Sequence, residues 1–420
     1  MAEHGRIYIW GAGEYGRKIL QAVKTPKYQV CRFVDNDPAK QGQMFEGIRI
    51  VSSREIAEEY DALVIAVMRY EAVLYQLRLE GYTDFSKVIV VFDESHCDNP
   101  EYAQILDQQK WKILLLEEKL KRLEKVVKAK FDNLGYEIID KYNKKMYQYP
   151  KIGSTEEAID KVVREGYSLV RFGDGEFEIM AGKERAVFQK YVPELAKRML
   201  EVISSKEEKL LICIADNYGN IDEYLEDDAN SIRFYMDEET RRFHMSVLDK
   251  NRTYYDAYMF KTYISYKNRE DTWKRVRLIK TIWDNRDVVI VEGDKTRAGY
   301  GNDLFDNAKS LQRILCPTQN AFDKYEEILE TVLRVEKSRL ILAVLGPAAK
   351  VLVYDLMRYG YQAVDIGQID MEYEWYLAGA KERVPIPGKY VSQLPSAEIK
   401  EVNDTEYLSQ IIGQIKADTD

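Results

Sequence analysis

The chain has 420 residues, of which 45% are hydrophobic and 32% are charged, and its formal net charge is −9. This length exceeds what one ordinary core organises, so it indicates two or three domains of a globular protein. The negative charge argues against a general nucleic-acid-binding protein, which needs excess cations to displace counterions. The four cysteines form no CxxC pair, so neither a zinc site nor a disulfide framework is indicated.

The N-terminal sequence lacks the basic region and following apolar region of a signal peptide. No run reaches the roughly 18 apolar residues that a membrane-spanning helix needs. We therefore expect a cytoplasmic protein.

Residues 5–95 alternate apolar strand patterns with amphipathic helical patterns, which indicates a parallel sheet with right-handed crossovers. The predicted strands cover residues 6–10, 30–35, 62–67 and 88–92.

A glycine-rich loop follows the first predicted strand and opens a helix. It has the form G-x-G-x-x-G, with Gly11, Gly13 and Gly16, and Asp35 ends the second predicted strand. Such a loop brings backbone N–H groups to a pyrophosphate, and a carboxylate placed like Asp35 binds ribose hydroxyls. The loop predicts a nucleotide or nucleotide-sugar ligand; the alternative is a domain that binds nothing or only a regulatory ligand. Residues 33–37, 41–42 and 47–51 resemble the nucleotide-sugar-binding module of bacterial sugar-modifying enzymes.

Residues 100–152 have a different, helical pattern. Apolar residues step by 3, 4, 3 and 4 from Ile113 to Val127, which is a heptad seam. Two interpretations remain open: a short coiled coil that makes a homodimer, or a helix packed on its own domain. Residues 110–151 hold twelve Lys and Arg against six Asp and Glu. This excess suits peripheral contact with the inner face of a membrane, or forms a solvated helix face.

A second α/β pattern begins at residues 154–157, which resemble a capping box. Strands are predicted at 168–171, 210–214, 288–291 and 340–345, and a helix in the tail. The predicted fold is α/β, with two Rossmann-like parallel-sheet domains joined by a helical segment. The expected boundaries are 1–99, 100–152, 153–395 and 396–420.

The sequence RFGDGE at residues 171–176 follows an apolar strand. Interpreted as a non-helical turn, it lets Asp174 and Glu176 point the same way. Two such carboxylates suit Mg²⁺ or Mn²⁺, with waters and substrate phosphates as further ligands. Arg171 adds a charge-assisted contact to the same phosphates. The alternative is an ordinary Asp-Gly turn with solvated acids.

Polar clusters also follow later predicted strands, and ligands bind at such strand ends in open α/β sheets. These clusters cover residues 292–297, 299–303, 346–350 and 365–375. Gly346 and Pro347 open a predicted helix whose free N–H groups suit phosphate, with Lys350 nearby.

Residues 171–176, 301–305, 313–317, 346–347, 365–367 and 372–375 together resemble the GT-D fold glycosyltransferases. The resemblance covers about residues 153–391. It implies a UDP-sugar donor, a divalent metal (Mn²⁺ or Mg²⁺) and an Asp-x-Glu metal motif, which falls on Asp174 and Glu176. A His often follows Asp-Ile-Gly in that family; Gln368 stands here, and an amide supplies only a neutral hydrogen-bonding group.

The main hypothesis is metal-assisted transfer of a hexose from a nucleotide-diphosphate sugar to a glycan or glycoprotein hydroxyl. Arg171, Arg297 and Lys350 would face the diphosphate. Asn302 and Asp303 would contact sugar or ribose. The candidate bases are Asp294, Asp365 and Glu374. The rival hypotheses are an NAD(P)-dependent nucleotide-sugar epimerase or dehydrogenase, and a non-catalytic scaffold of a polysaccharide assembly complex.

Overall fold

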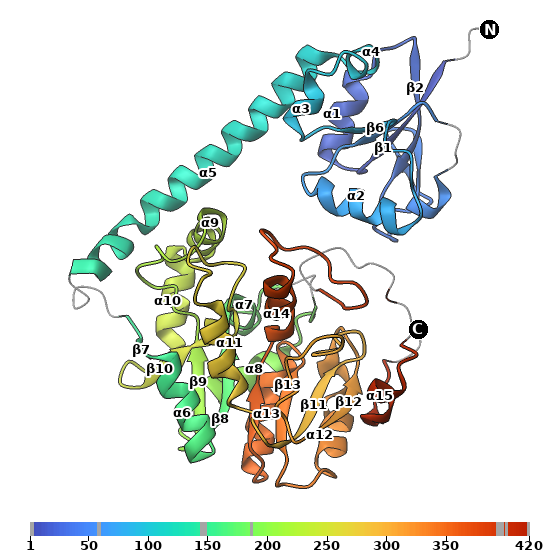
Figure 1. Cartoon of the computed structure of the whole chain (residues 1–420). Coiled ribbons are helices and arrows are strands. Elements are labelled where there is room, and N and C mark those ends of the chain that lie inside the picture. The colour runs from blue at the N-terminus through green and yellow to red at the C-terminus, as the bar shows by residue number, and fades with distance from the viewer. Residues whose placement is uncertain are drawn as a thin grey trace. The chain divides into compact units, whose positions relative to one another are not determined.

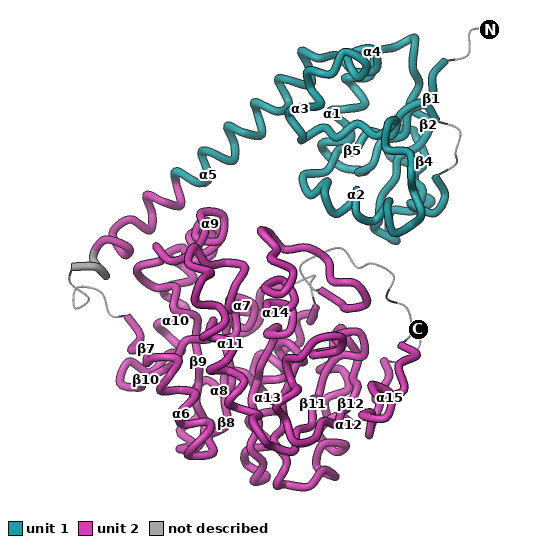
Figure 2. The backbone as a smooth tube through the Cα atoms, viewed as in Figure 1, with its two compact units in different colours: residues 1–127 teal, residues 128–420 magenta. Residues whose placement is uncertain are grey.

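The computed structural model describes residues 4–56, 60–142, 149–184, 188–391, 399 and 402–417. The chain divides into two compact units, Met1–Val127 and Lys128–Asp420 (Figure 2). The division falls inside one continuous helix, α5 (Gln108–Tyr142), which is seen in Figure 1. A helical segment therefore does join two α/β units, and each unit includes part of it.

Unit 1 contains a six-stranded sheet in the order β3-β4-β2-β1-β5-β6, parallel except where β3 meets β4. Its strands are β1 (Gly5–Trp10), β2 (Tyr28–Val34), β3 (Met44–Phe45), β4 (Ile48–Val51), β5 (Ala62–Ile65) and β6 (Val88–Val90). Its helices are α1 (Glu14–Ala22), η1 (Ser53–Glu55), α2 (Tyr70–Leu79), α3 (Glu94–Cys97), α4 (Tyr102–Ile105) and the first part of α5.

Unit 2 contains a nine-stranded sheet in the order β15-β12-β11-β13-β14-β8-β9-β10-β7, and every pairing in it is parallel. Its strands are β7 (Lys151–Gly153), β8 (Ser168–Phe172), β9 (Leu210–Ile214), β10 (Thr253–Asp256), β11 (Asp287–Gly293), β12 (Ser310–Cys316), β13 (Leu340–Val344), β14 (Ala363–Asp365) and β15 (Ile411–Gln414). The predicted parallel α/β architecture is confirmed for both units.

Helices cover both faces of this second sheet (Figure 1). Besides the last part of α5, the helices described in unit 2 are α6 (Thr155–Glu165), α7 (Asp174–Met180), α8 (Pro193–Ile203), α9 (Glu226–Tyr235), α10 (Glu238–Val247), η2 (Ala257–Phe260), α11 (Thr272–Lys280), η3 (Ala321–Lys324), α12 (Tyr325–Val332), α13 (Ala348–Arg358), α14 (Ile369–Leu377) and α15 (Thr405–Ser409).

The sequence explains why the central strands lie where they do. Strands β9 and β13 are buried at every position, because their uninterrupted apolar runs suit a sheet covered on both faces. Helix α6 begins where the Ser154 side chain accepts a hydrogen bond from Glu157 N at 3.1 Å. It ends at Gly166, whose φ of 72° is the left-handed conformation that glycine adopts easily.

The predicted terminal helix is wrong for part of the tail. Among the described residues of the tail, Thr405–Ser409 is the only helix, and Ile411–Gln414 forms strand β15 beside β12. Ile415, which follows the strand, is buried beside the core. The predicted helix through Ile411 and Ile412 did not anticipate this burial. Within the described residues, no helix combines the length and apolarity that a membrane span requires.

Candidate functional site

A cleft lies at the carboxyl ends of four neighbouring strands, β11, β13, β14 and β8. Residues directly after these strands line it: Gly173 after β8, Thr296 and Ala298 after β11, Gly346 after β13, and Gly367 after β14. The polar clusters that the sequence placed after separate strands therefore meet at one edge of one sheet. This edge is where open α/β folds bind ligands.

An ion network crosses the floor of the cleft. Arg171 donates from Nε to Asp365 O at 2.9 Å and from a terminal nitrogen to Asp365 Oδ1 at 3.2 Å. The Lys350 ammonium lies 3.1 Å from Asp365 Oδ2 and 2.9 Å from Glu176 Oε1. Burial acts to raise the pKa of Asp365, but the charges of Arg171 and Lys350 outweigh it and lower that pKa. Asp365 is therefore an ionised partner of two cations.

Two glycines at the cleft allow side chains to pack closely against the backbone. Gly367 has a φ of 51°, and a Cβ there would lie 1.7 Å from an Arg171 terminal nitrogen. Gly346 has a φ of 54°, and a Cβ there would lie 2.1 Å from the Phe188 ring. Any larger residue at position 367 would displace the arginine that holds Asp365.

The acidic turn at residues 171–176 is not the non-helical turn that the sequence suggested. Helix α7 begins at Asp174, so this residue and Glu176 both lie in its first turn. Glu176 reaches back to accept a hydrogen bond from Gly173 N at 2.9 Å. Residues two apart on a helix do not face each other. Both still line the cleft, where the exposed Asp174 carboxylate makes no hydrogen bond or ion pair with the described residues.

A buried histidine supports the start of α7. The Tyr235 hydroxyl lies 3.3 Å from Asp174 O, to which it donates, and 2.9 Å from His244 Nε2. On the other side of the ring, the Tyr218 hydroxyl lies 2.8 Å from Nδ1. Since Tyr235 has one proton to donate, we infer that it accepts from Nε2–H, while Nδ1 accepts from Tyr218. Burial lowers the pKa of His244 to about 3, so the ring stays neutral.

One wall of the cleft, formed after β10, was not predicted from the sequence. Tyr258, Phe260 and Lys261 line it there, and Arg383 and Tyr390 line it from the segment after α14. The Lys261 ammonium lies 3.8 Å from the Tyr258 ring centre and has no hydrogen bond or ion pair within the described ranges. Burial lowers the pKa of Lys261, although the charge of Asp174 acts to raise it. Lys261 belongs to no sequence motif. Its position after strand β10 is the one sequence signal that could have placed it in the cleft.

Comparisons with known proteins agree with this geometry. The family model described as glycosyltransferase GT-D fold matches residues 169–394, which is more than half of the chain. The chain belongs to the GT-D fold glycosyltransferase family. A second model, described as C2185-like N-terminal, matches residues 3–84.

Two curated relatives and two solved structures resemble the GT-D part. A probable glycosyl transferase of Streptococcus gordonii is 36% identical over 264 residues, which are 62% of this chain and 38% of the relative. A glycosyltransferase of Streptococcus pneumoniae serotype 4 is 35% identical over 268 residues, 63% of this chain and 32% of the relative. The chain thus matches about a third of either relative's length.

Both structures are 36% identical to this chain and cover 64% of it. One, described as a domain of unknown function with a distinct glycosyltransferase fold, has a TM-score of 0.61 and is 97% covered. The other, described as a new glycosyltransferase from Streptococcus sanguinis, has a TM-score of 0.59 and is wholly covered, at 100%.

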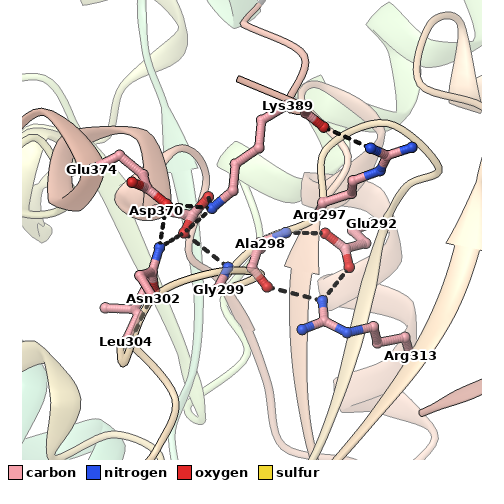
Figure 3. A network of polar contacts seen from close by, with 11 residues as sticks. Glu292, Arg297, Ala298, Gly299, Asn302, Leu304, Arg313, Asp370, Glu374 and Lys389 are labelled. Carbon is pink, nitrogen blue, oxygen red and sulfur yellow. Dashed lines mark hydrogen bonds and ion pairs between the residues drawn. The ribbon is translucent and has the colours of Figure 1, made fainter. Parts of the chain in front are cut away.

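Several predicted ligand residues of the GT-D part lie instead in a buried network beside the cleft, shown in Figure 3. Lys389 donates to Asp370 Oδ2 at 2.8 Å and to Glu374 Oε1 at 2.7 Å. Asn302 donates to the same two carboxylates at 2.8 and 2.7 Å. Arg297 donates to Gly388 O at 2.8 Å. These contacts fix the loop after β11 to the segment after α14.

A second part of this network surrounds the buried ion pair of Arg313 and Glu292. Arg313 is ion-paired with Glu292 and donates to Ala298 O at 2.9 Å, while Ala298 N donates to Glu292 Oε2 at 2.7 Å (Figure 3). Burial raises the pKa of Glu292 even though Arg313 acts to lower it.

Asp303 and Asp294, the predicted sugar-contacting residue and candidate base, also have partners within the chain. Asp303 accepts a hydrogen bond from the Tyr373 hydroxyl at 2.6 Å, which lowers the pKa of Asp303. The Thr318 hydroxyl donates to Asp294 Oδ1 at 2.5 Å. Gln368 lines the cleft just before α14, together with Gly346, Pro347 and Lys350.

The glycine loop of unit 1 has the local geometry of its motif. A Cβ at Gly16 would lie 2.0 Å from Gly11 O, so only glycine allows this close approach of helix to loop. A Cβ at Gly13 would meet no atom within 4 Å, so the space around this residue is open. Asp35 accepts from Ala12 N at 3.0 Å and pairs with Lys40 at 3.1 Å. The Asp35 carboxylate therefore orders the loop itself.

Proposed function

We propose that the chain transfers a hexose from a nucleotide-diphosphate sugar, a UDP-sugar, to a hydroxyl of a glycan or glycoprotein acceptor. Membership of the GT-D family supports the reaction class. The observation that carries the proposal is the cleft at the ends of β8, β11, β13 and β14, which gathers carboxylates and cations on one sheet edge. A departing nucleoside diphosphate needs such cations, because it develops negative charge.

The donor set suits a divalent cation at the start of α7. Asp174 offers an exposed carboxylate, and Glu176 lines the same cleft with one oxygen held by Gly173 N. The other oxygen, Oε1, lies 2.9 Å from the Lys350 ammonium, so a metal would share it with that lysine. Mg²⁺ and Mn²⁺ are held by one or two carboxylates together with waters and substrate phosphates. We propose that Asp174 and Glu176 hold the metal, which when bound neutralises charge on the leaving diphosphate.

The cations of the cleft divide into two kinds. Lys350 and Arg171 are engaged with Asp365 and Glu176, so we propose that they hold these carboxylates in position beneath the donor. Lys261 has no such partner among the described residues, and its ammonium is free to contact a donor phosphate. The nearby Tyr258 and Phe260 rings exclude water from that contact, which strengthens it.

The decisive experiment measures donor hydrolysis and transfer by the full chain across a panel of nucleotide sugars, with Mn²⁺, Mg²⁺ or chelator. Asp174→Asn and Glu176→Gln should each lower metal-dependent turnover of the preferred donor about 10²-fold or more. The matched control is Glu178→Gln, a carboxylate on the same helix that does not line the cleft. Full, metal-independent turnover by the first two variants would refute the metal assignment, and inactivity toward every donor would refute the reaction.

A further inference from the structure

Helix α5 carries apolar residues on two opposite faces. One face packs into unit 1: Trp111 and Leu114 are buried, and Trp111 Nε1 donates to Val91 O at 2.8 Å. The other face is exposed, with side-chain exposures between 56% and 63%. We call it the α5 stripe, and its members are Ile113, Leu116, Leu120, Leu123 and Val127. Five large apolar side chains in one exposed row are unusual unless a partner covers them.

The spacing of the stripe identifies the kind of partner. Its members follow one another at intervals of 3, 4, 3 and 4 residues, which are the alternating a and d positions of a coiled coil. A straight helix has about 3.6 residues per turn, so a stripe of this period stays in contact only with another helix wound around it. Ile113, Leu120 and Val127 occupy a positions, while Leu116 and Leu123 occupy d positions, so two of the three a residues are β-branched and both d residues are leucine. β-branched residues at a with leucine at d favour two parallel strands.

Charges beside the stripe distinguish the two possible directions of that second helix. The charged e positions are Glu117 and Glu124, and the charged g positions are Lys112 and Lys119; the remaining g position, Val126, carries no charge. When two copies of α5 run parallel, each g residue faces the next e residue of the other copy, so both contacts between these charged residues join a lysine to a glutamate. When they run antiparallel, e faces e and g faces g, so every contact joins like charges.

We propose that the α5 stripe is the interface between two copies of this chain, joined as a parallel two-stranded coiled coil. The flanking lysines already have partners in unit 1, since Lys112 pairs with Asp98 and Lys119 with Glu94. The side chains of both lysines and both acidic partners are more than half exposed. Exposed ion pairs of this kind contribute little to the stability of the fold. The lysines can therefore exchange these partners for, or share them with, a glutamate of the second copy.

The first test measures the mass of the full chain by sedimentation or light scattering over a dilution series. The unmodified chain should be a dimer that dissociates on dilution. Leu123→Glu should weaken dimerisation at least ~tenfold while circular dichroism stays unchanged, because the side chain is exposed in the single chain. The control is Lys125→Glu, which lies two residues after Leu123 and outside the stripe. It changes the net charge more than Leu123→Glu does, and it should leave the dimer intact. A chain that stays monomeric at tens of micromolar, or two variants that behave alike, would overturn the proposal.

The second test addresses direction. Glu117→Lys with Glu124→Lys should abolish the dimer, because all four charged e and g positions then carry lysine. Adding Lys112→Glu and Lys119→Glu exchanges the signs and should restore it in a parallel coil only. Failure of this four-residue exchange to restore the dimer, in a chain whose unmodified form dimerises, would exclude the parallel arrangement.

Discussion

The ammonium of Lys350 lies 2.9 Å from Glu176 Oε1 and thereby joins helix α13 to the first turn of α7. The same ammonium lies 3.1 Å from Asp365, which Arg171 also holds. Lys350 is almost completely buried, so both acids depend on it for charge compensation. The sequence shows a lysine near a helix start but not the two carboxylates that surround it.

Lys350→Met should reduce the free energy of unfolding of unit 2 by about 3–5 kcal/mol, because it removes one of the two cations that compensate Asp365 and the cation that pairs with Glu176. Denaturant unfolding followed by tryptophan fluorescence measures this loss. The control is Lys197→Met, whose side chain is 78% exposed beside Glu194 and which should change stability by less than about 0.5 kcal/mol. Equal effects of the two substitutions would contradict the role of the buried network.

Gly367→Ala should destabilise the fold more than Gly301→Ala. Both glycines have positive φ values, 51° and 79°, so both substitutions meet a backbone cost of about 1 kcal/mol. Only at position 367 would the new Cβ also collide with Arg171, whereas it meets nothing within 4 Å at position 301. The difference between the two melting temperatures isolates the collision. Indistinguishable variants would show that Arg171 can move away without cost.

Asp256 should make stability fall as the pH rises. Burial and, to a lesser extent, the charge of Asp216 raise the pKa of Asp256 from 3.8 to about 7. Between these two values the folded chain binds a proton that the unfolded chain has lost, so the free energy of unfolding decreases with increasing pH. Asp256→Asn keeps an oxygen to accept from Tyr258 N and should flatten that decrease. Unfolding curves at a series of pH values measure it; identical pH profiles for both proteins would contradict the assignment.

Lys261→Ala should lower kcat for donor turnover by about 10²-fold, while substitution of an exposed lysine outside the cleft, such as Lys197→Ala, should not. Lys261→Arg keeps the positive charge and should retain part of the rate. Steady-state kinetics on the preferred nucleotide sugar separates kcat from KM. A rise in KM alone would place this lysine in ground-state donor binding rather than beside the leaving diphosphate.

The sequence predicted the sheets well because buried parallel strands are continuous apolar runs. The segments at 210–214 and 340–345 are strands β9 and β13. The sequence also predicted which strands are followed by polar residues. Those strands are neighbours in the sheet, so their polar ends lie together. Short strands such as β7 and β10 were not recognised, because runs of three or four residues carry little periodic signal. The seven-residue strand β12 was also missed, because Gln312 and Arg313 interrupt its apolar run.

Side-chain partners could not be predicted in the same way. Asn302 and Glu374 look like ligand residues in sequence, yet Asn302 Nδ2 donates to Asp370 and Glu374, and Glu374 Oε1 also accepts from Lys389. These four come from three separate segments, and only the folded chain shows that their charges offset one another. The acidic turn was misassigned for a local reason, since the bond from Gly173 N to Glu176 starts a helix where the glycines suggested a loop.

The pairing of β14 with β8 has a consequence for how the fold is assembled. These central strands share one register pair, Val364 with Leu169, whereas β8 and β9 share five. The residues of that pair lie almost two hundred positions apart, and contacts of such long sequence separation form slowly, so we expect them to form late in folding. The sheet would then form as two halves that meet between β14 and β8. Arg171 and Asp365 bond to each other across this boundary, so we expect the last step of folding to complete the cleft as well.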